Sequence, residues 1–440
     1  MHGLEHFMRL AACLVVAAGL GAVIKWPDAG RQYTEKVAQL RIEPAPLAGR
    51  ACVRGESPLS GPFAPIDDIL SVSPLGGVTA PGEPLPAPYV RLNTLQGATA
   101  FERRTTTALA PARADVVAIE RHVARDAAGA PTGLTWSVHF AACQTVRFSY
   151  DDLDEISPDL LAKAGGLKAF VEIGGPDHLA LTTQLRVRAG EVIGKADGFD
   201  IALENAAVPP AALDRPERYR PNTYNHATAI NAPQTIIDAI SPDVSRAQCP
   251  LDYLPEKIAG AWKAKLGDAF GFRKARGDNA CRTALADIPG TAQGAWFTDA
   301  SHNGLTRKVS AVALAPDVID PARLIFALHG RLASLGADMV GLSPFLEDER
   351  AEAARDFLTF EARKGRINTP FDKVRPGESY CYEGLRVNFV GPRINGVILL
   401  ALSEETGAPL MKIEARGDVL SCIDLAEPWS FTGAETTFYR

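Results

Sequence analysis

Short segments rich in β-branched and aromatic residues, separated by turn residues, constrain the fold of this chain more than any other feature. Two clear examples are 115–119, Asp-Val-Val-Ala-Ile, and 134–140, Leu-Thr-Trp-Ser-Val-His-Phe. Gly, Pro and Asp punctuate the chain at 126–133 and 174–177. Side chains of these types fit the pleated, half-buried surface of a strand. A succession of such strands predicts a β-sandwich or barrel rather than a parallel α/β sheet.

A second β-rich unit is predicted over 291–440. One helix, 346–364, is expected to interrupt it, because charged and apolar residues are interspersed there. The fold class predicted from the sequence is therefore mainly β, a β-rich α+β protein. The strands expected in the second unit are 310–314, 322–328, 384–390 and 396–402.

Between the two β units, 236–290 is expected to form a helical connector. Leu254, Ile258, Trp262 and Leu266 recur every fourth residue, which places them on one face of a helix. Another helix is expected to begin at 157–158, where Ser is a suitable N-cap and Pro a suitable first helical residue.

The first 25 residues have the polarity of an export signal. Arg9 precedes an uncharged apolar run over 10–24, which Lys25-Trp26-Pro27 ends. As a helix this run would be about 22 Å long, short of the roughly 30 Å of a bilayer core. The length favours a signal peptide, but the poor cleavage site leaves a signal anchor open. Residues 26–89 are expected to form an extended lead-in or a wrapping strand.

The cysteine count fits an exported protein. Seven cysteines are present, and one of them, Cys13, lies in the apolar run. An even number of remaining cysteines in an exported chain favours disulfides, although buried free thiols stay an alternative. There is no Cys-x-x-Cys, so neither a zinc ribbon nor a thioredoxin-like site is indicated. The simplest pairing is sequential: Cys52–Cys143, Cys249–Cys281 and Cys381–Cys422.

Four segments within 95–205 occur in an order and at spacings found in a known family. They are 109–120, 147–153, 186–194 and 198–204. Together they resemble the lysostaphin-type zinc endopeptidases, which have the duplicated hybrid motif fold and cut peptidoglycan cross-links. The resemblance implies a barrel-sandwich hybrid-like domain over 90–235. Within it, Gly190 and Gly194 are expected to serve backbone geometry in a strand–turn–strand unit.

The chain departs from that family at the metal ligands. Residues 90–108 contain no histidine, and Ala202 stands where the family has a ligand histidine. Asp200 matches the first His of the family's His-x-His strand, and Asp151 or Asp152 matches its additional active-site His. A catalytic zinc needs three protein ligands and an open position for water. Asp152 and Asp200 are therefore only weak metal candidates, and no catalytic residue is assigned.

The histidines offer no obvious replacement ligands. Asp177-His178 is the only adjacent acid–histidine pair and is interpreted as a polar turn. The acidic run 151–155 lacks the spacing of a calcium loop and is interpreted as a solvated turn. No cofactor is expected. None of the histidines beyond the apolar run lies two or four residues from another: His122, His139, His178, His226, His302 and His329.

Further segments resemble uncharacterised bacterial proteins in which a ligand-poor hybrid-motif domain precedes a small β domain. The similarity covers about 140–415 and implies an architecture without a known activity. The segments are 249–256, 287–297, 380–384 and 396–400.

These observations predict an exported, non-catalytic protein that binds or scaffolds in the periplasmic or extracellular cell envelope, with peptidoglycan or an envelope protein as partner. The alternative is a peptidoglycan metallohydrolase with an atypical carboxylate site at Asp152 and Asp200. A third hypothesis, a membrane-anchored structural protein, requires that residues 10–24 are retained, since no other segment is expected to contact a membrane. The net charge of −6 and the lack of basic runs argue against nucleic-acid binding.

Overall fold

The computed structural model describes residues 50–440 with internal gaps. The expected signal segment and the first part of the lead-in lie outside the described residues. No described helix is long and apolar enough to cross a membrane. The gaps are 54–55, 79–85, 100–101, 126–128, 212, 214–235, 237–238, 241–242, 277–279, 282–286, 299, 301–310, 330–356, 388–392, 394 and 406–407.

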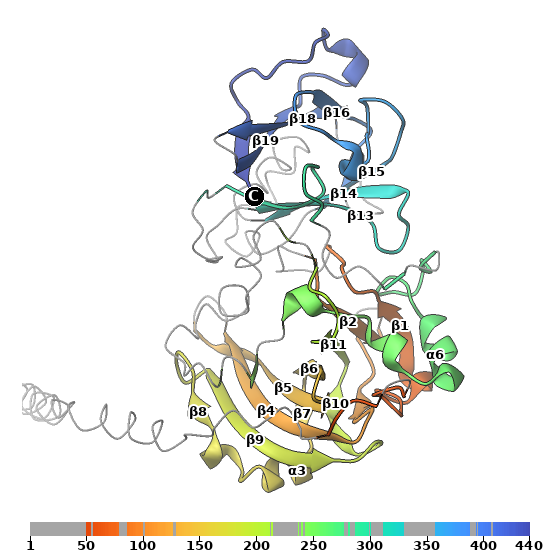
Figure 1. The fold of residues 1–440 in the computed structure, drawn as a ribbon, viewed down its shortest axis with the longest axis vertical. Helices are drawn as coiled ribbons and strands as arrows, with labels where there is room; N and C mark the ends of the chain where they lie inside the picture. The colour runs from red at the N-terminus through yellow and green to blue at the C-terminus, as the bar shows by residue number, and fades with distance from the viewer. Residues whose placement is uncertain are drawn as a thin grey trace, which may run out of the picture. The chain divides into compact units, whose positions relative to one another are not determined.

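Large antiparallel sheets dominate the described chain, so the mainly β prediction is confirmed (Figure 1). The first sheet has eight strands in the order β1-β2-β11-β6-β5-β4-β9-β8, and its long strands β4, β5 and β9 curve together. Its strands are β1 (Ile69–Ser73), β2 (Tyr89–Thr94), β4 (Ala114–Arg125), β5 (Pro131–Cys143), β6 (Val146–Leu153), β8 (Val171–Glu172), β9 (His178–Val187) and β11 (Gly198–Asn205).

A small second sheet has the order β3-β10-β7 and consists of β3 (Thr106–Leu109), β10 (Val192–Ala196) and β7 (Glu155–Ile156). One apolar core takes residues from both sheets, such as Ile119, Phe140 and Tyr150 from the large sheet and Ala108 and Ile193 from the small one. Side chains of successive strand residues point to opposite faces. The eight-stranded sheet therefore has one apolar face in this core and a second face that is free to carry polar residues.

The lead-in contributes strand β1 to the edge of the large sheet, after the short 3-10 turn η1 (Ile66–Asp68). On its outer side, the Val72 amide donates to the Lys265 carbonyl, and the Val72 carbonyl accepts from the Gly267 amide. Residues 265–267 therefore occupy backbone groups that an edge strand would otherwise leave without a strand partner.

Helical structure is short. Ser157 is the N-cap of α3 (Pro158–Lys163) and Pro158 is its first residue, as predicted. The expected helix over 254–266 is reduced to α6 (Glu256–Lys263), in which Trp262 is buried against Phe63 with ring centroids 5.3 Å apart. The remaining short 3-10 turns are η2 (Leu167–Ala169), η5 (Val244–Arg246), η6 (Pro250–Tyr253), η10 (Phe371–Lys373) and η11 (Cys422–Asp424).

The C-terminal part forms a nine-stranded sheet in the order β16-β18-β19-β20-β12-β13-β14-β15-β17. The helix predicted over 346–364 is wrong at its end, because Phe357–Glu361 is strand β15. It pairs with both neighbours, and Leu358, Thr359 and Phe360 are all buried. The other strands are β12 (Gly294–Phe297), β13 (Ala311–Pro316), β14 (Arg323–His329), β16 (Ser379–Tyr382), β17 (Arg386–Val387), β18 (Val397–Glu405), β19 (Ala408–Arg416) and β20 (Thr436–Tyr439).

Three disulfides join the cysteines in the sequential pattern. Cys52–Cys143 ties the lead-in to β5 across a sequence separation of 91 residues. Cys249–Cys281 lies in the connector, and Cys381–Cys422 lies in the C-terminal sheet region. Such bonds persist in oxidising compartments and are rare in reducing ones. The disulfides therefore indicate an exported protein.

The expected strand–turn–strand unit joins β9 to β10. Gly190 has a positive φ of 81°, which glycine adopts without strain. Gly194 has a different role, because a Cβ at this position would lie 2.2 Å from the Glu155 carbonyl oxygen of β7. Gly194 allows β10 to approach β7 closely enough for the two to pair.

We expect Gly194→Ala to destabilise the protein by about 1–3 kcal/mol or more, because the added methyl group meets rigid backbone. The matched control is Gly260→Ala in α6, where a Cβ would meet nothing within 4 Å. That change should be neutral or stabilise by up to about 1 kcal/mol, because alanine favours helix. Urea unfolding of both variants measures the difference, and equal stabilities would contradict the close-approach role.

Candidate functional site

The face of the eight-stranded sheet that points away from the apolar core carries an unusual number of polar side chains. Glu120 of β4, His139 and Ser137 of β5, Ser149 of β6 and His178 of β9 are all buried there. Buried polar groups must be hydrogen-bonded to offset the loss of water. The contacts of these side chains therefore define the site.

Glu120 is the centre of the cluster and is 1% exposed. The Nε2 atom of His139 lies 2.7 Å from its Oε1 oxygen, and the Nε2 atom of His178 lies 2.7 Å from its Oε2 oxygen. A carboxylate only accepts, so both imidazoles donate. A third imidazole, that of His122, places Nε2 3.6 Å from Oε2 and stacks on the His178 ring with centroids 4.1 Å apart.

Strand register explains why these residues meet. His122 of β4 is directly opposite His178 of β9. The residues directly opposite Glu120 are small, Ser137 on β5 and Ala180 on β9. Long side chains at diagonal positions come within reach of one another across a sheet. The small neighbours leave room for the diagonal histidines to reach the carboxylate.

Glu120 and His122 have pKa values shifted in opposite directions. Burial alone would raise the pKa of Glu120, but its contacts with His122, His139 and His178 outweigh burial and hold that pKa well below its usual range. Burial would lower the pKa of His122, but its contact with Glu120 raises it instead. The Glu120 carboxylate is therefore charged, and it favours the protonated form of His122.

A β-bulge brings a second acid beside the cluster. Val138 pairs with Tyr150 and Trp136 pairs with Leu153, so Asp151 and Asp152 together face a single residue of β5. Asp151 accepts a hydrogen bond from the Ser149 hydroxyl at 2.8 Å, and burial raises its pKa. Asp152 has a positive φ of 63°, an uncommon conformation in which Asp is enriched among non-glycine residues.

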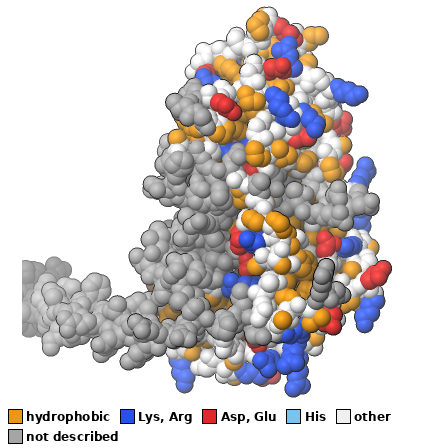
Figure 2. All heavy atoms as spheres, in the orientation of Figure 1, with side chains coloured by type: hydrophobic (Ala, Val, Ile, Leu, Met, Phe, Trp, Pro, Cys, Tyr) orange, Lys and Arg blue, Asp and Glu red, His pale blue; other side chains and the backbone are white. Residues whose placement is uncertain are grey.

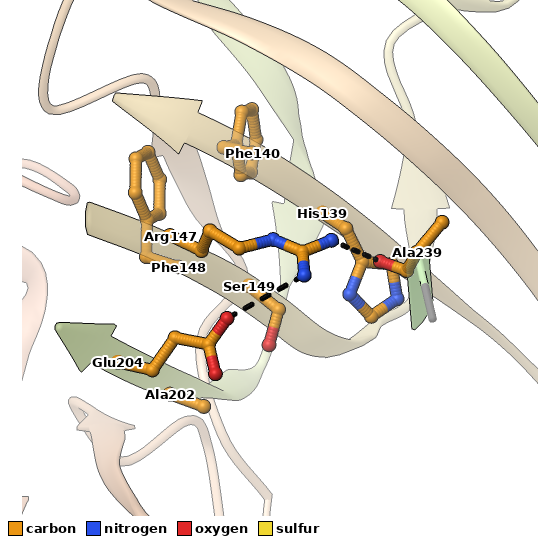
Figure 3. A pocket seen from close by; sticks show the side chains of 8 residues that line it. All are labelled: His139, Phe140, Arg147, Phe148, Ser149, Ala202, Glu204 and Ala239. Atoms are coloured by element: carbon orange, nitrogen blue, oxygen red, sulfur yellow. Dashed lines mark hydrogen bonds and ion pairs between the residues drawn. The ribbon is translucent and has the colours of Figure 1, made fainter. Parts of the chain in front are cut away.

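Asp152 and Asp200, the two metal candidates from the sequence, both form ion pairs with Arg91. Arg91 Nη1 lies 2.9 Å from Asp152 Oδ2 and 2.9 Å from Asp200 Oδ1. Burial would lower the pKa of Arg91, but the two carboxylates raise it. Ala202, at the family's ligand position, lines a small hollow with His139 (Figure 3).

In that hollow Arg147 contacts both the Glu204 side chain and the backbone of Ala239 (Figure 3). The Arg147 Nη1 atom is 3.6 Å from Glu204 Oε1, and its Nη2 donates to the Ala239 carbonyl at 3.2 Å. Burial raises the pKa of Glu204. Beside the histidine cluster, Ile236 and Ile240 pack on Ala118 and Ala180 of the same face.

The interpretation of the histidines as isolated is wrong for three of them. His122, His139 and His178 converge through three strands, although no two are close in sequence. The turn interpretation of 177–178 is half right, because Asp177 is half-exposed and pairs with Arg125 at 2.6 Å, while His178 begins β9 and is buried. His226 and His302 lie outside the described residues.

We expect Arg91→Ala to destabilise the protein by about 1–3 kcal/mol, because the nearly buried Asp200 carboxylate loses this cation. Asp152→Ala should cost less than about 1 kcal/mol, because Asp152 is half-exposed and its contact is screened by water. Urea unfolding midpoints give both values. Equal costs would show that the contact of Arg91 with Asp200 adds no stability beyond its contact with Asp152.

A basic hollow lies at the ends of β4 and β9 and beside α3. It is lined by Arg113, Lys163, Arg186, Arg188 and Glu191. Glu191 is engaged by Lys163 at 2.8 Å, which lowers its pKa. Figure 2 shows Lys and Arg side chains gathered at the edge of the molecule where Figure 1 places α3 and β9.

Comparisons with known proteins give this chain no relative. No protein-family model, no curated protein and no solved structure matches it.

Proposed function

We propose that this is an exported, non-catalytic protein that binds peptidoglycan in the cell envelope and acts there as a binding or scaffolding component. The observation that carries binding is the basic hollow of Arg113, Lys163, Arg186 and Arg188. Peptidoglycan stem peptides present free carboxylates, and arginine side chains recognise carboxylates through paired hydrogen bonds. The disulfides support a location outside the reducing cytosol, in the periplasm or beyond it.

The contacts of Arg91 weigh against the alternative of a peptidoglycan metallohydrolase at Asp152 and Asp200. The Arg91 guanidinium already forms ion pairs with both carboxylates, each at 2.9 Å. A metal ion at this place would compete with a cation that is held by two ion pairs. The proposal that the domain is a degenerate member of the lysostaphin-type peptidases rests on the four sequence segments and on this difference at the ligand positions.

Sedimentation with insoluble peptidoglycan tests the proposal. The double variant Arg113→Glu/Arg188→Glu should lose at least about tenfold in binding at low salt, because it reverses two charges in the hollow. The matched control Lys257→Glu/Lys274→Glu makes the same charge change at two exposed positions elsewhere and should bind like the original protein. Equal binding by both double variants would refute the assignment of the hollow. Release of soluble muropeptides by the original protein would refute the non-catalytic role.

A further inference from the structure

The Glu120 cluster has the composition of a metal site, and none of its ligand candidates belongs to the basic hollow or to the Asp152–Asp200 pair. The ligand atoms of Glu120, His122 and His178 all lie within 4.8 Å of one another. Two imidazole nitrogens and one carboxylate oxygen are a donor set that zinc uses with a fourth position open to water. Imidazole donors favour first-row transition metals over magnesium and calcium.

We infer that Glu120, His122 and His178 form a binding site for a divalent transition-metal cation of the zinc class. Metal–ligand bonds of about 2.0–2.2 Å around a tetrahedral ion place neighbouring ligand atoms about 3.4 Å apart. The His122–Glu120 separation of 3.6 Å already fits this value. The His178–Glu120 hydrogen bond of 2.7 Å has to open by less than about 1 Å, as the ion replaces the bridging proton.

His139 has a supporting role in this arrangement. It donates at 2.7 Å to Oε1 of Glu120, the oxygen opposite the one that faces His122 and His178. Such contacts orient a ligating carboxylate and strengthen metal binding. His139 is therefore a positioning residue, and its loss should weaken the site without removing it.

Access and charge also favour a cation. The His122 side chain is 35% exposed, so one side of the cluster is open to solvent. The carboxylates of Asp151 and Asp152 also act electrostatically on His122, although the charge of Asp152 is already paired with Arg91. Because paired strands of one sheet hold all the ligands, few side-chain rotations remain to be fixed when the ion binds.

The experiment uses the untagged, disulfide-bonded protein after chelator treatment and titrates it with Zn²⁺ against a coloured chelator, and with Co²⁺ by visible absorption. We expect one equivalent of each metal and an absorption band typical of tetrahedral Co²⁺. His122→Ala and His178→Ala should each weaken Zn²⁺ binding at least about 100-fold. His139→Ala should weaken it about 10–100-fold and leave the stoichiometry at one.

Asp152→Ala is the control, because Asp152 does not belong to the donor set and is paired with Arg91. It should change Zn²⁺ affinity less than about threefold. The His122 side chain is 35% exposed and Glu120 keeps its hydrogen bonds from His139 and His178, so His122→Ala should lower the metal-free unfolding midpoint much less than Glu120→Ala, which separates lost binding from lost folding. No bound metal, equal affinity in His122→Ala, or loss of metal in Asp152→Ala would each overturn the site. None of these results bears on peptidoglycan sedimentation, which depends on the basic hollow.

Discussion

Replacement of Glu120 by alanine is expected to destabilise the chelator-treated protein by about 3–5 kcal/mol. Glu120 is buried and accepts hydrogen bonds from His139 and His178, while it favours the charged form of His122. Removing one partner of a buried ionic network costs this much, because the remaining polar groups stay buried without compensation. Urea unfolding at neutral pH, with the disulfides intact, gives the value.

Two further variants test the cause of this loss of stability. Glu120→Gln keeps the shape and one acceptor but removes the charge, so its cost should lie between zero and that of Glu120→Ala. Glu155→Ala, at an exposed position 3.8 Å from Lys195, should cost less than about 0.5 kcal/mol. A Glu120→Ala cost below about 1 kcal/mol would mean that water replaces the carboxylate and that the cluster does not hold the three strands together.

Removal of the Cys52–Cys143 disulfide is the second large effect. The bond closes a loop over 91 residues, and loop-closure entropy predicts a loss of about 4–5 kcal/mol in the Cys52→Ala/Cys143→Ala variant. The shortest loop, Cys249–Cys281 over 32 residues, should cost about 3–4 kcal/mol when removed in the same way. Denaturant unfolding of each double alanine variant, without reductant, measures the two losses.

The comparison is informative because Cys143, Cys249 and Cys281 are buried and Cys52 is partly buried, so both bonds lie in packed surroundings. If the Cys249–Cys281 variant is the less stable of the two, native-state packing around 249–281 outweighs the entropy of the unfolded chain. Either result, a less stable Cys249–Cys281 variant or equal losses of stability, would contradict the prediction that removing the disulfide with the longer loop costs more.

The strands were predictable because their information is local. Alternation and β-branched content at 115–119 and 134–140 identify β4 and β5, and Ser157-Pro158 identifies the start of α3. The predicted end of helix 346–364 failed because β15 is buried on both faces, between β14 and β17. A strand without alternation cannot be distinguished from a helix face by period alone.

The histidine cluster depends on the register between paired strands, which local sequence patterns do not determine. A search for two histidines separated by two or four residues overlooks a glutamate and a histidine with that spacing. Glu120 and His122 are such a pair, and they lie on the same face of one strand. The pairing of β4 with β5 places His139 within two positions of the residue opposite Glu120, so a hairpin predicted from the turn residues in 126–133 would have identified part of the cluster. His178 arrives through β9, whose pairing with β4 no short segment predicts. Arg91 reaches Asp200 in the same non-local way.

Residues 265–267 cover the β1 edge of the large sheet, and this limits how another protein can bind to that sheet. An open edge strand is a template for strand addition and for aggregation. At one edge the backbone of β1 is already engaged by 265–267, and at the other edge β8 has only two residues. β8 pairs only with Leu179 and Ala180 of the ten-residue β9, so it covers a small part of the outer side of that strand. Strand addition is therefore blocked at the β1 edge, where a partner has to recognise side chains, and surface substitutions can alter such recognition while they leave the backbone pairing intact.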